Sequence, residues 1–284
     1  MKSGLFFCAR FLALCLWHFM SVAIAALVVG NVVSLVDQGQ PSAGFASLFA
    51  ISILETAVVV WMITRSNLSG IRLLVVTLVV FHGVKIFLMM IELAFFLNIW
   101  ASPPMISLER VLALEVHGLL MACLFCPVAI ATFKKRTSPG PIQPTIFPLF
   151  HSSLMIKLLN VSVLYAVCYW MTGSFLLIPL AGKSFDFTYG NLQVPSWMPL
   201  FQMGRGVLWA LVVFLLVRHL RVHGIRLYVG IGVTLAILGG AQLLMPNPYM
   251  LDHLRYVHLL EILVSMLIFG GLAGWILRKE RWLP

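Results

Sequence analysis

The sequence has few charged residues: Asp, Glu, Lys and Arg make up 10% of its 284 residues, whereas a soluble domain carries about 25%. Acidic residues are the scarcest, with 9 Asp and Glu against 19 Lys and Arg, so the formal net charge is +10. Hydrophobic residues make up 61%, and the mean hydropathy is +1.03. This shortage of charge excludes an ordinary soluble protein and predicts an all-α integral membrane protein, because long apolar runs cross a bilayer as helices.

Motifs of several common enzyme and channel classes are also missing. The sequence contains no HExxH, no nucleophile elbow, no P-loop and no Gly-rich selectivity filter. Its five cysteines lie in apolar segments, so no extracellular disulfide framework is expected. Most Lys and Arg lie in short loops between apolar runs, which is the positive-inside pattern of membrane proteins, and nucleic acid is therefore not an expected partner.

Eight apolar segments predict about eight transmembrane helices. They lie near residues 5–36, 44–63, 73–99, 110–133, 153–180, 199–217 and 227–245, with a last segment that ends at 277. Most Lys and Arg fall at alternate ends of these segments, and placing those ends in the cytoplasm puts both termini inside. The sequence thus predicts a multi-pass protein of the bacterial inner membrane, in contact with the lipid bilayer.

A proline-rich stretch divides the chain near its middle. The predicted cytoplasmic linker 137–152 separates a first four-helix half (1–136) from a second (153–284). Each half has a proline and a methionine at the same distance before an arginine, Arg110 in the first and Arg255 in the second. Two four-helix repeats of the same orientation are one interpretation. Chance similarity between apolar sequences is the other.

Ionisable residues lie within the predicted helices, where each costs at least ~2.5 kcal/mol if it stays unpaired. With a rise of about 1.5 Å per residue, several of them lie roughly 5–12 Å below the outer surface. This set comprises Glu92, Glu115, His117, Arg205, His258 and Glu261, with Arg110 and Arg255 just above it. Four helices contribute to it, so we expect a polar cavity in the outer half of the membrane.

Residue chemistry assigns candidate roles within this cavity. The candidate coupling or acid–base groups are His258, Glu261, Glu115 and Glu92. The candidate ligand-binding residues are Arg205, Arg255, Arg110, Gln202 and Asn247. Gly204 and Gly206 flank Arg205 and permit close approach of backbone or ligand. The simpler interpretation is that Arg205 pairs with Glu92, Glu115 or Glu261 and holds the bundle together.

A second group lies nearer the middle of the membrane. His82 and Lys85 share a helix face, and Glu55 lies at a similar depth on another segment. These residues predict a proton or ion path, although an ion pair between Lys85 and Glu55 explains them equally well. His18 is expected to be a packing residue.

No cofactor is expected from the motifs. Metal binding is left open, because His258, Glu261, Glu92, Glu115 and His117 supply nitrogen and oxygen donors. Haem is also left open, with His18, His82, His117 and His258 as candidate axial ligands.

Three functions fit these features. The first is a small permease or exporter for an anionic or amphipathic solute. The second is an intramembrane enzyme that acts on a lipid-linked substrate from the outer face, with His258 as general acid or base. The third is a substrate-free membrane subunit or assembly factor. The expected ligand is an anionic small molecule or lipid, and a homo-oligomer or a membrane partner is left open.

Overall fold

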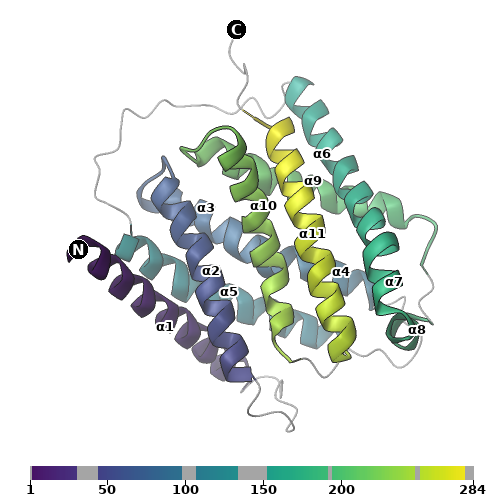
Figure 1. Ribbon diagram of the computed structural model, residues 1–284, viewed down its shortest axis with the longest axis horizontal. Coiled ribbons are helices and arrows are strands. Elements are labelled where there is room, and N and C mark those ends of the chain that lie inside the picture. The colour runs from purple at the N-terminus through teal and green to yellow at the C-terminus, as the bar shows by residue number, and fades with distance from the viewer. Residues whose placement is uncertain are drawn as a thin grey trace.

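The computed structural model describes residues 2–30, 44–97, 107–133, 152–190, 194–246 and 250–278, which form a helical bundle (Figure 1). Within these ranges there is no β-strand beyond one isolated bridge. In the described part of the chain, eight helical spans are long and apolar enough to cross a membrane. The prediction of an all-α, multi-pass membrane bundle is therefore confirmed.

Four spans lie before the linker. They are α1 (Lys2–Gly30), α2 (Gly44–Arg65), a composite third span and α5 (Leu108–Phe133). The third span joins α3 (Gly70–His82), the π-helix η1 (Gly83–Phe87) and α4 (Leu88–Phe96). We call it span 3.

Four more spans follow the linker. The fifth joins α6 (Ser152–Thr172), the π-helix η2 (Gly173–Leu177) and α7 (Ile178–Ala181), and the short α8 (Lys183–Tyr189) comes after it. The remaining spans are α9 (Met198–His219), α10 (Ile225–Gly240) with the 3-10 turn η3 (Ala241–Leu244), and α11 (Asp252–Ile276). The sequence missed both π-helices.

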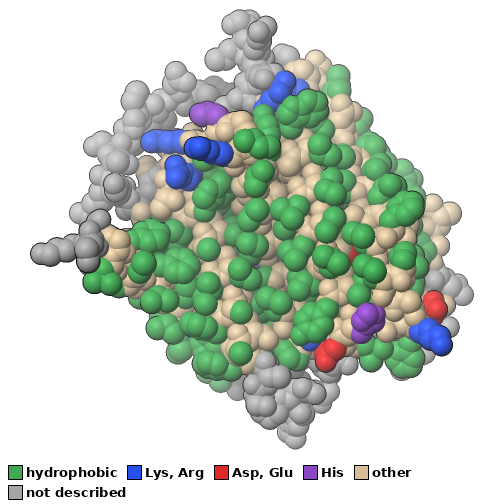
Figure 2. All heavy atoms as spheres, viewed as in Figure 1, with side chains coloured by type: hydrophobic (Ala, Val, Ile, Leu, Met, Phe, Trp, Pro, Cys, Tyr) green, Lys and Arg blue, Asp and Glu red, His purple; other side chains and the backbone are tan. Residues whose placement is uncertain are grey.

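Hydrophobic side chains cover the outside of the bundle as well as its core. Leu5, Ile71, Phe175 and Leu200 are each more than two-thirds exposed in the protein alone. Figure 2 shows hydrophobic side chains over most of one face, with most of the visible Lys and Arg gathered at its upper left. Such a surface suits lipid rather than water as the solvent.

The loops α2–α3 and α9–α10 meet at one end of the bundle. Ser66 and Leu220 form an isolated antiparallel bridge, in which the Arg221 N–H donates to Arg65 O at 2.7 Å and the Asn67 N–H donates to His219 O at 2.9 Å. We call this basic end, predicted to be cytoplasmic, the inner end. The opposite end, which holds α8, is the outer end.

Both loops lead into the same local structure. The tetrapeptide Gly-Ile-Arg-Leu occurs at residues 70–73 and again at 224–227. Gly70 and Gly224 both have a positive φ, 57° and 60°, which an L-residue rarely adopts. The next helix, α3 or α10, begins at this turn.

Helices pack in the same order before and after the linker. Helix α1 packs between α2 and α5, and α5 packs on α3; likewise α6 packs between α9 and α11, and α11 packs on α10. Between the two sets, α2 contacts α10, α3 contacts α9, and η1 contacts both α9 and α10. Span 3 therefore lies at the junction of the two sets. The linker itself lies almost entirely outside the described residues, so the boundaries 1–136, 137–152 and 153–284 stay a prediction.

Candidate functional site

Span 3 carries an ionisable residue in each of its three parts. His82 ends α3, Lys85 lies in η1, and Glu92 lies in α4. The π-helix begins at Gly83 and changes the angular spacing of the side chains that follow it. As a result the three residues reach three different helices rather than forming one stripe. π-helical turns are frequent at functional sites.

Lys85 belongs to a buried group at mid-membrane depth. Its ammonium donates to both carboxylate oxygens of Glu55 on α2. Glu55 is 0% exposed and Lys85 is 7% exposed. The third member is His18 of α1, whose Nε2 lies 3.3 Å from Glu55 Oε2. His18 was expected to be only a packing residue. It does pack on Phe125, with ring centroids 4.4 Å apart, but it also adjoins the carboxylate.

The surroundings of this group contain buried polar atoms with no hydrogen-bond partner among the described residues. They are His18 Nδ1 and Ser52 Oγ, whereas Thr56 lies beside the Cys15 thiol. Ser52 lies three residues before Glu55 on α2, so the two side chains are neighbours on the same helix face. Buried polar atoms are normally paired, and such exceptions mark a functional role or a bound water. The mid-membrane group thus has spare capacity for a proton or a water molecule.

Glu92 belongs to a second group, nearer the outer end. Glu92 Oε2 lies 3.0 Å from Arg205 Nη2 of α9, and Gln202 Nε2 donates to Glu92 Oε1 at 3.2 Å. Arg205 Nη1 donates to Gln202 Oε1 at 2.8 Å, and its Nη2 also donates to Leu88 O at 2.9 Å. Arg205 is 2% exposed, yet its Nε has no partner among the described residues.

Three tyrosines surround this outer group. The Tyr165 ring centroid lies 5.6 Å from Arg205 Cζ, a cation–π distance, and Tyr169 lies beside Glu92. Tyr189, on α8 outside the spans, has a pKa raised to about 12 by burial and by the charges of Glu92 and Glu261. Helix α8 contacts α11, the helix that carries Glu261.

Glu261 forms a third group with residues from two spans. Thr172 of α6 donates to Glu261 Oε1 at 2.8 Å, and His258 Nδ1 lies 3.0 Å from Glu261 Oε2. Thr172 immediately precedes η2, so both π-helices adjoin a paired carboxylate. Glu261 is 6% exposed, whereas the His258 side chain is 26% exposed.

Other predicted site residues lie apart from these groups. Glu115 pairs with His82 at 2.8 Å. His117 turns to α1, with its Nε2 3.3 Å from Val22 O. Arg255 donates to the carbonyls of Leu243 and Met245, as well as to Asp252, and so it caps the end of η3.

Two predicted ligand-binding residues, Arg110 and Asn247, and the predicted outer cavity remain. The backbone N–H of Arg110 donates to Ser107 Oγ near the start of α5. Asn247 lies outside the described residues. The outer charges are largely paired with each other, and the cavity predicted there stays a prediction.

The sequence did not predict three residues of these groups: Tyr165, Tyr169 and Thr172. A tyrosine or threonine in an apolar segment gives no signal by itself, because its role depends on the neighbouring helix. A glycine at the start of each π-helix, Gly83 and Gly173, is the one local feature that the two share.

Among the described residues, no group of three or more His, Cys, Asp and Glu side chains is arranged to hold a metal ion. His, Glu and Lys side chains can exchange protons, and an arginine guanidinium such as that of Arg205 can bind an anion. Searches for relatives found no matching family model, no matching curated protein and no matching solved structure.

Proposed function

We propose that this protein is a proton-coupled permease for a small anionic solute. One observation carries the proposal: span 3 makes three side-chain contacts with ionisable residues, two ion pairs and one His–carboxylate hydrogen bond, and each joins it to a different helix. His82 pairs with Glu115 of α5, Lys85 with Glu55 of α2, and Glu92 with Arg205 of α9. Span 3 lies at the junction between the two sets of helices, which is where many carriers bind their solute.

The energetic cost of these residues supports a functional role. Charged side chains within the bilayer are expensive, and well-packed apolar residues in place of a buried pair are often as stable or more stable. The bundle therefore does not need three pairs on one span for stability. Ionisable residues retained at this depth usually mark a proton or solute path.

Arg205 is the proposed anion-binding residue. Its guanidinium is already neutralised by Glu92, 3.0 Å away, and its Nε is an unused buried donor. Protonation of Glu92 would remove the competing negative charge from Arg205. A carboxylate or phosphate of the solute would then take the place of Glu92 on the guanidinium, which has the planar geometry to bind it through two hydrogen bonds. Proton uptake and anion binding are coupled in this way.

Glu55 and Lys85 are the proposed second proton site. Protonation of Glu55 would remove the partner of the Lys85 ammonium, and a released side chain in a π-helical turn can change its position. His18, which adjoins Glu55, and the buried hydroxyl of Ser52 would exchange the proton. The same span would thus respond to protons at two depths.

The packing order and the repeated Gly-Ile-Arg-Leu turn support two halves of the same orientation. The excess of Lys and Arg at the inner end supports cytoplasmic termini and insertion in a bacterial inner membrane.

The test is proton movement evoked by anions in proteoliposomes that contain a pH-sensitive dye. The probes are phosphate, succinate and glutamate, each added outside. We expect at least one to change the internal pH in the wild type, and Arg205→Gln and Glu55→Gln to abolish the response. Lys183→Gln, which removes a cation from α8 outside the spans, should leave it unchanged. The absence of any response in the wild type would contradict the proposal for these anions.

The group at Glu261 favours a second candidate, an intramembrane enzyme acting on a lipid-linked substrate. A carboxylate that is anchored by Thr172 and adjoins an imidazole nitrogen can orient His258 as a general acid or base. His258→Gln separates the two functions. An enzyme would lose turnover, whereas the permease would retain anion-evoked proton movement. If the pairs hold together a substrate-free subunit, neither activity exists.

A further inference from the structure

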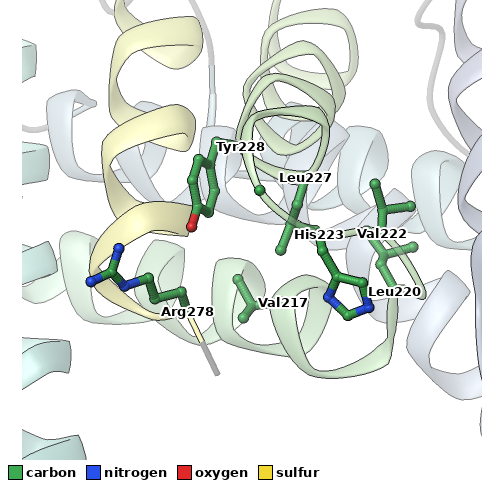
Figure 3. Close-up of a pocket in the computed structure, with 8 residues that line it drawn as sticks. Val217, Leu220, Val222, His223, Leu227, Tyr228 and Arg278 are labelled. Carbon is green, nitrogen blue, oxygen red and sulfur yellow. The ribbon is translucent and has the colours of Figure 1, made fainter. Parts of the chain in front are cut away.

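A cavity of about 260 Å³ opens at the inner end of the bundle, away from the paired residues of the outer half. It lies between the end of α9, the start of α10 and the end of α11. Val217 and Leu227 form an apolar part of its wall, and His223, Tyr228 and Arg278 supply polar groups (Figure 3). In Figure 3 the Tyr228 hydroxyl points to the side of the cavity where Arg278 lies.

The surroundings of this cavity favour a negative charge. None of the described residues that line it is acidic. The lining segment also carries the exposed residues Arg221 and Arg226. Gly224, at the edge of the cavity, is the N-cap of α10 and has no side chain to cap the helix. The first N–H groups of α10 and the positive end of its dipole add to the cationic side chains.

The size of the cavity limits what it can hold. Pockets for drug-sized ligands usually measure about 300–1,000 Å³. A cavity of 260 Å³ suits a single phosphate with a small substituent rather than a nucleotide. Its mixed lining, cationic and hydroxyl groups beside an apolar wall, matches the boundary between headgroups and acyl chains. Basic pockets between helices on the cytoplasmic side are known to bind lipid headgroups.

We propose that this cavity binds the phosphate of an anionic phospholipid headgroup from the inner leaflet. Arg278 and Tyr228 donate hydrogen bonds to the phosphate oxygens, with the start of α10 beside them. The acyl chains extend over the exposed apolar surface of α10 and α11. A free phosphate has the same recognition chemistry and is distinguished by the experiment. The site is independent of the proposed transport function, because its residues lie outside the three groups of that site.

The experiment measures binding to the full-length protein in detergent by native mass spectrometry. The probes are a short-chain phosphatidylglycerol, the phosphatidylcholine of the same chain length, and inorganic phosphate. We expect saturable binding of phosphatidylglycerol, with Arg278→Gln weakening it about tenfold or more, as for a lost charge-assisted hydrogen bond. The matched control is Arg72→Gln, which removes an exposed cation from the first turn of α3, in the equivalent Gly-Ile-Arg-Leu sequence, and should have little effect.

Two results would overturn the proposal. Equal binding of both lipids would show that the cavity does not select an anionic headgroup. Equal weakening by Arg278→Gln and Arg72→Gln would show a general effect of surface charge. Binding of inorganic phosphate without binding of phosphatidylglycerol would assign the cavity to a soluble phosphate instead. If Arg278→Gln does not fold, Tyr228→Phe provides the test, because it keeps the ring and removes one donor. Wild-type affinity for phosphatidylglycerol in Tyr228→Phe would then exclude the assigned hydroxyl and overturn the geometry.

Discussion

The Glu55–Lys85 pair allows a quantitative test of the bundle's interior. Lys85→Met leaves Glu55, which is 0% exposed, without its cation. Glu55→Gln leaves Lys85, 7% exposed, without its anion. Removing one partner of a buried pair costs about 3–5 kcal/mol, because the other charge remains uncompensated. We expect each single variant to lose stability on this scale.

The double variant Glu55→Gln/Lys85→Met should behave differently. Replacing both members of a buried pair is often neutral or stabilising, so the double variant should be more stable than either single variant. The coupling energy of the cycle is then at least about 3 kcal/mol. The assay is reversible unfolding in mixed micelles, followed by tryptophan fluorescence.

The matched control is the Arg255–Asp252 pair, in which the Asp252 side chain is 78% exposed. Arg255 is only 3% exposed, but the Asp252 carboxylate stays in solvent, so we expect this half-exposed pair to couple by no more than about 1 kcal/mol. A coupling of similar size at Glu55–Lys85, or a double variant whose loss equals the sum of the single losses, would refute the buried ion pair. If the double variant is stable but has lost anion-evoked proton movement, the pair is needed for proton transport and not for the stability of the bundle.

Three further predictions concern single residues. A Cβ at Gly206 would lie 2.6 Å from Ser162 O, so Gly206→Ala should cost about 1–3 kcal/mol in the micelle assay, whereas Gly204→Ala, with open space around it, should not destabilise the protein. The tyrosinate absorbance of wild type minus Tyr189→Phe should titrate near pH 12 rather than 10.0. Because the pKa of Tyr189 is higher in the folded protein than in the unfolded chain, the contribution of its neutral phenol to folding stability is complete below pH 10.0 and is lost as the pH rises to about 12. A titration midpoint at 10.0 would show an unburied phenol. Gly224→Ala should lose about 1–2 kcal/mol, since φ is 60° there, and an unchanged stability would contradict the turn geometry.

The eight spans could be predicted from the sequence because lipid leaves the backbone few choices. An apolar run of this length must pair its own N–H and C=O groups, and the helix does so locally. The predicted bounds of the third segment, 73–99, differ from the observed 70–96 by three residues. The interruption of that span by a π-helix was not predicted, because the apolar pattern continues through it.

The pairing of the site residues was only partly predictable. Depth could be counted along each helix, and it placed Arg205 level with three carboxylates. The choice of Glu92 depends on which face of α9 meets α4, and that is a property of the packed bundle. His18 shows the same limit: its position beside Glu55 follows from the contact of α1 with α2. Of the two glycines that flank Arg205, the structure places only Gly206 against another backbone.

The most direct test of the transport proposal is the accessibility of the anion site from each side of the membrane. In a variant with all five cysteines replaced, Gln202→Cys places a thiol beside Glu92 and Arg205. A membrane-impermeant thiol reagent is applied to vesicles of either orientation, with Ala129→Cys as a buried control, since Ala129 is 0% exposed. A permease predicts labelling from both sides, because its site opens alternately. Labelling from the outer side alone would favour the enzyme, and labelling from neither side, as in the control, would contradict a solute path through this group.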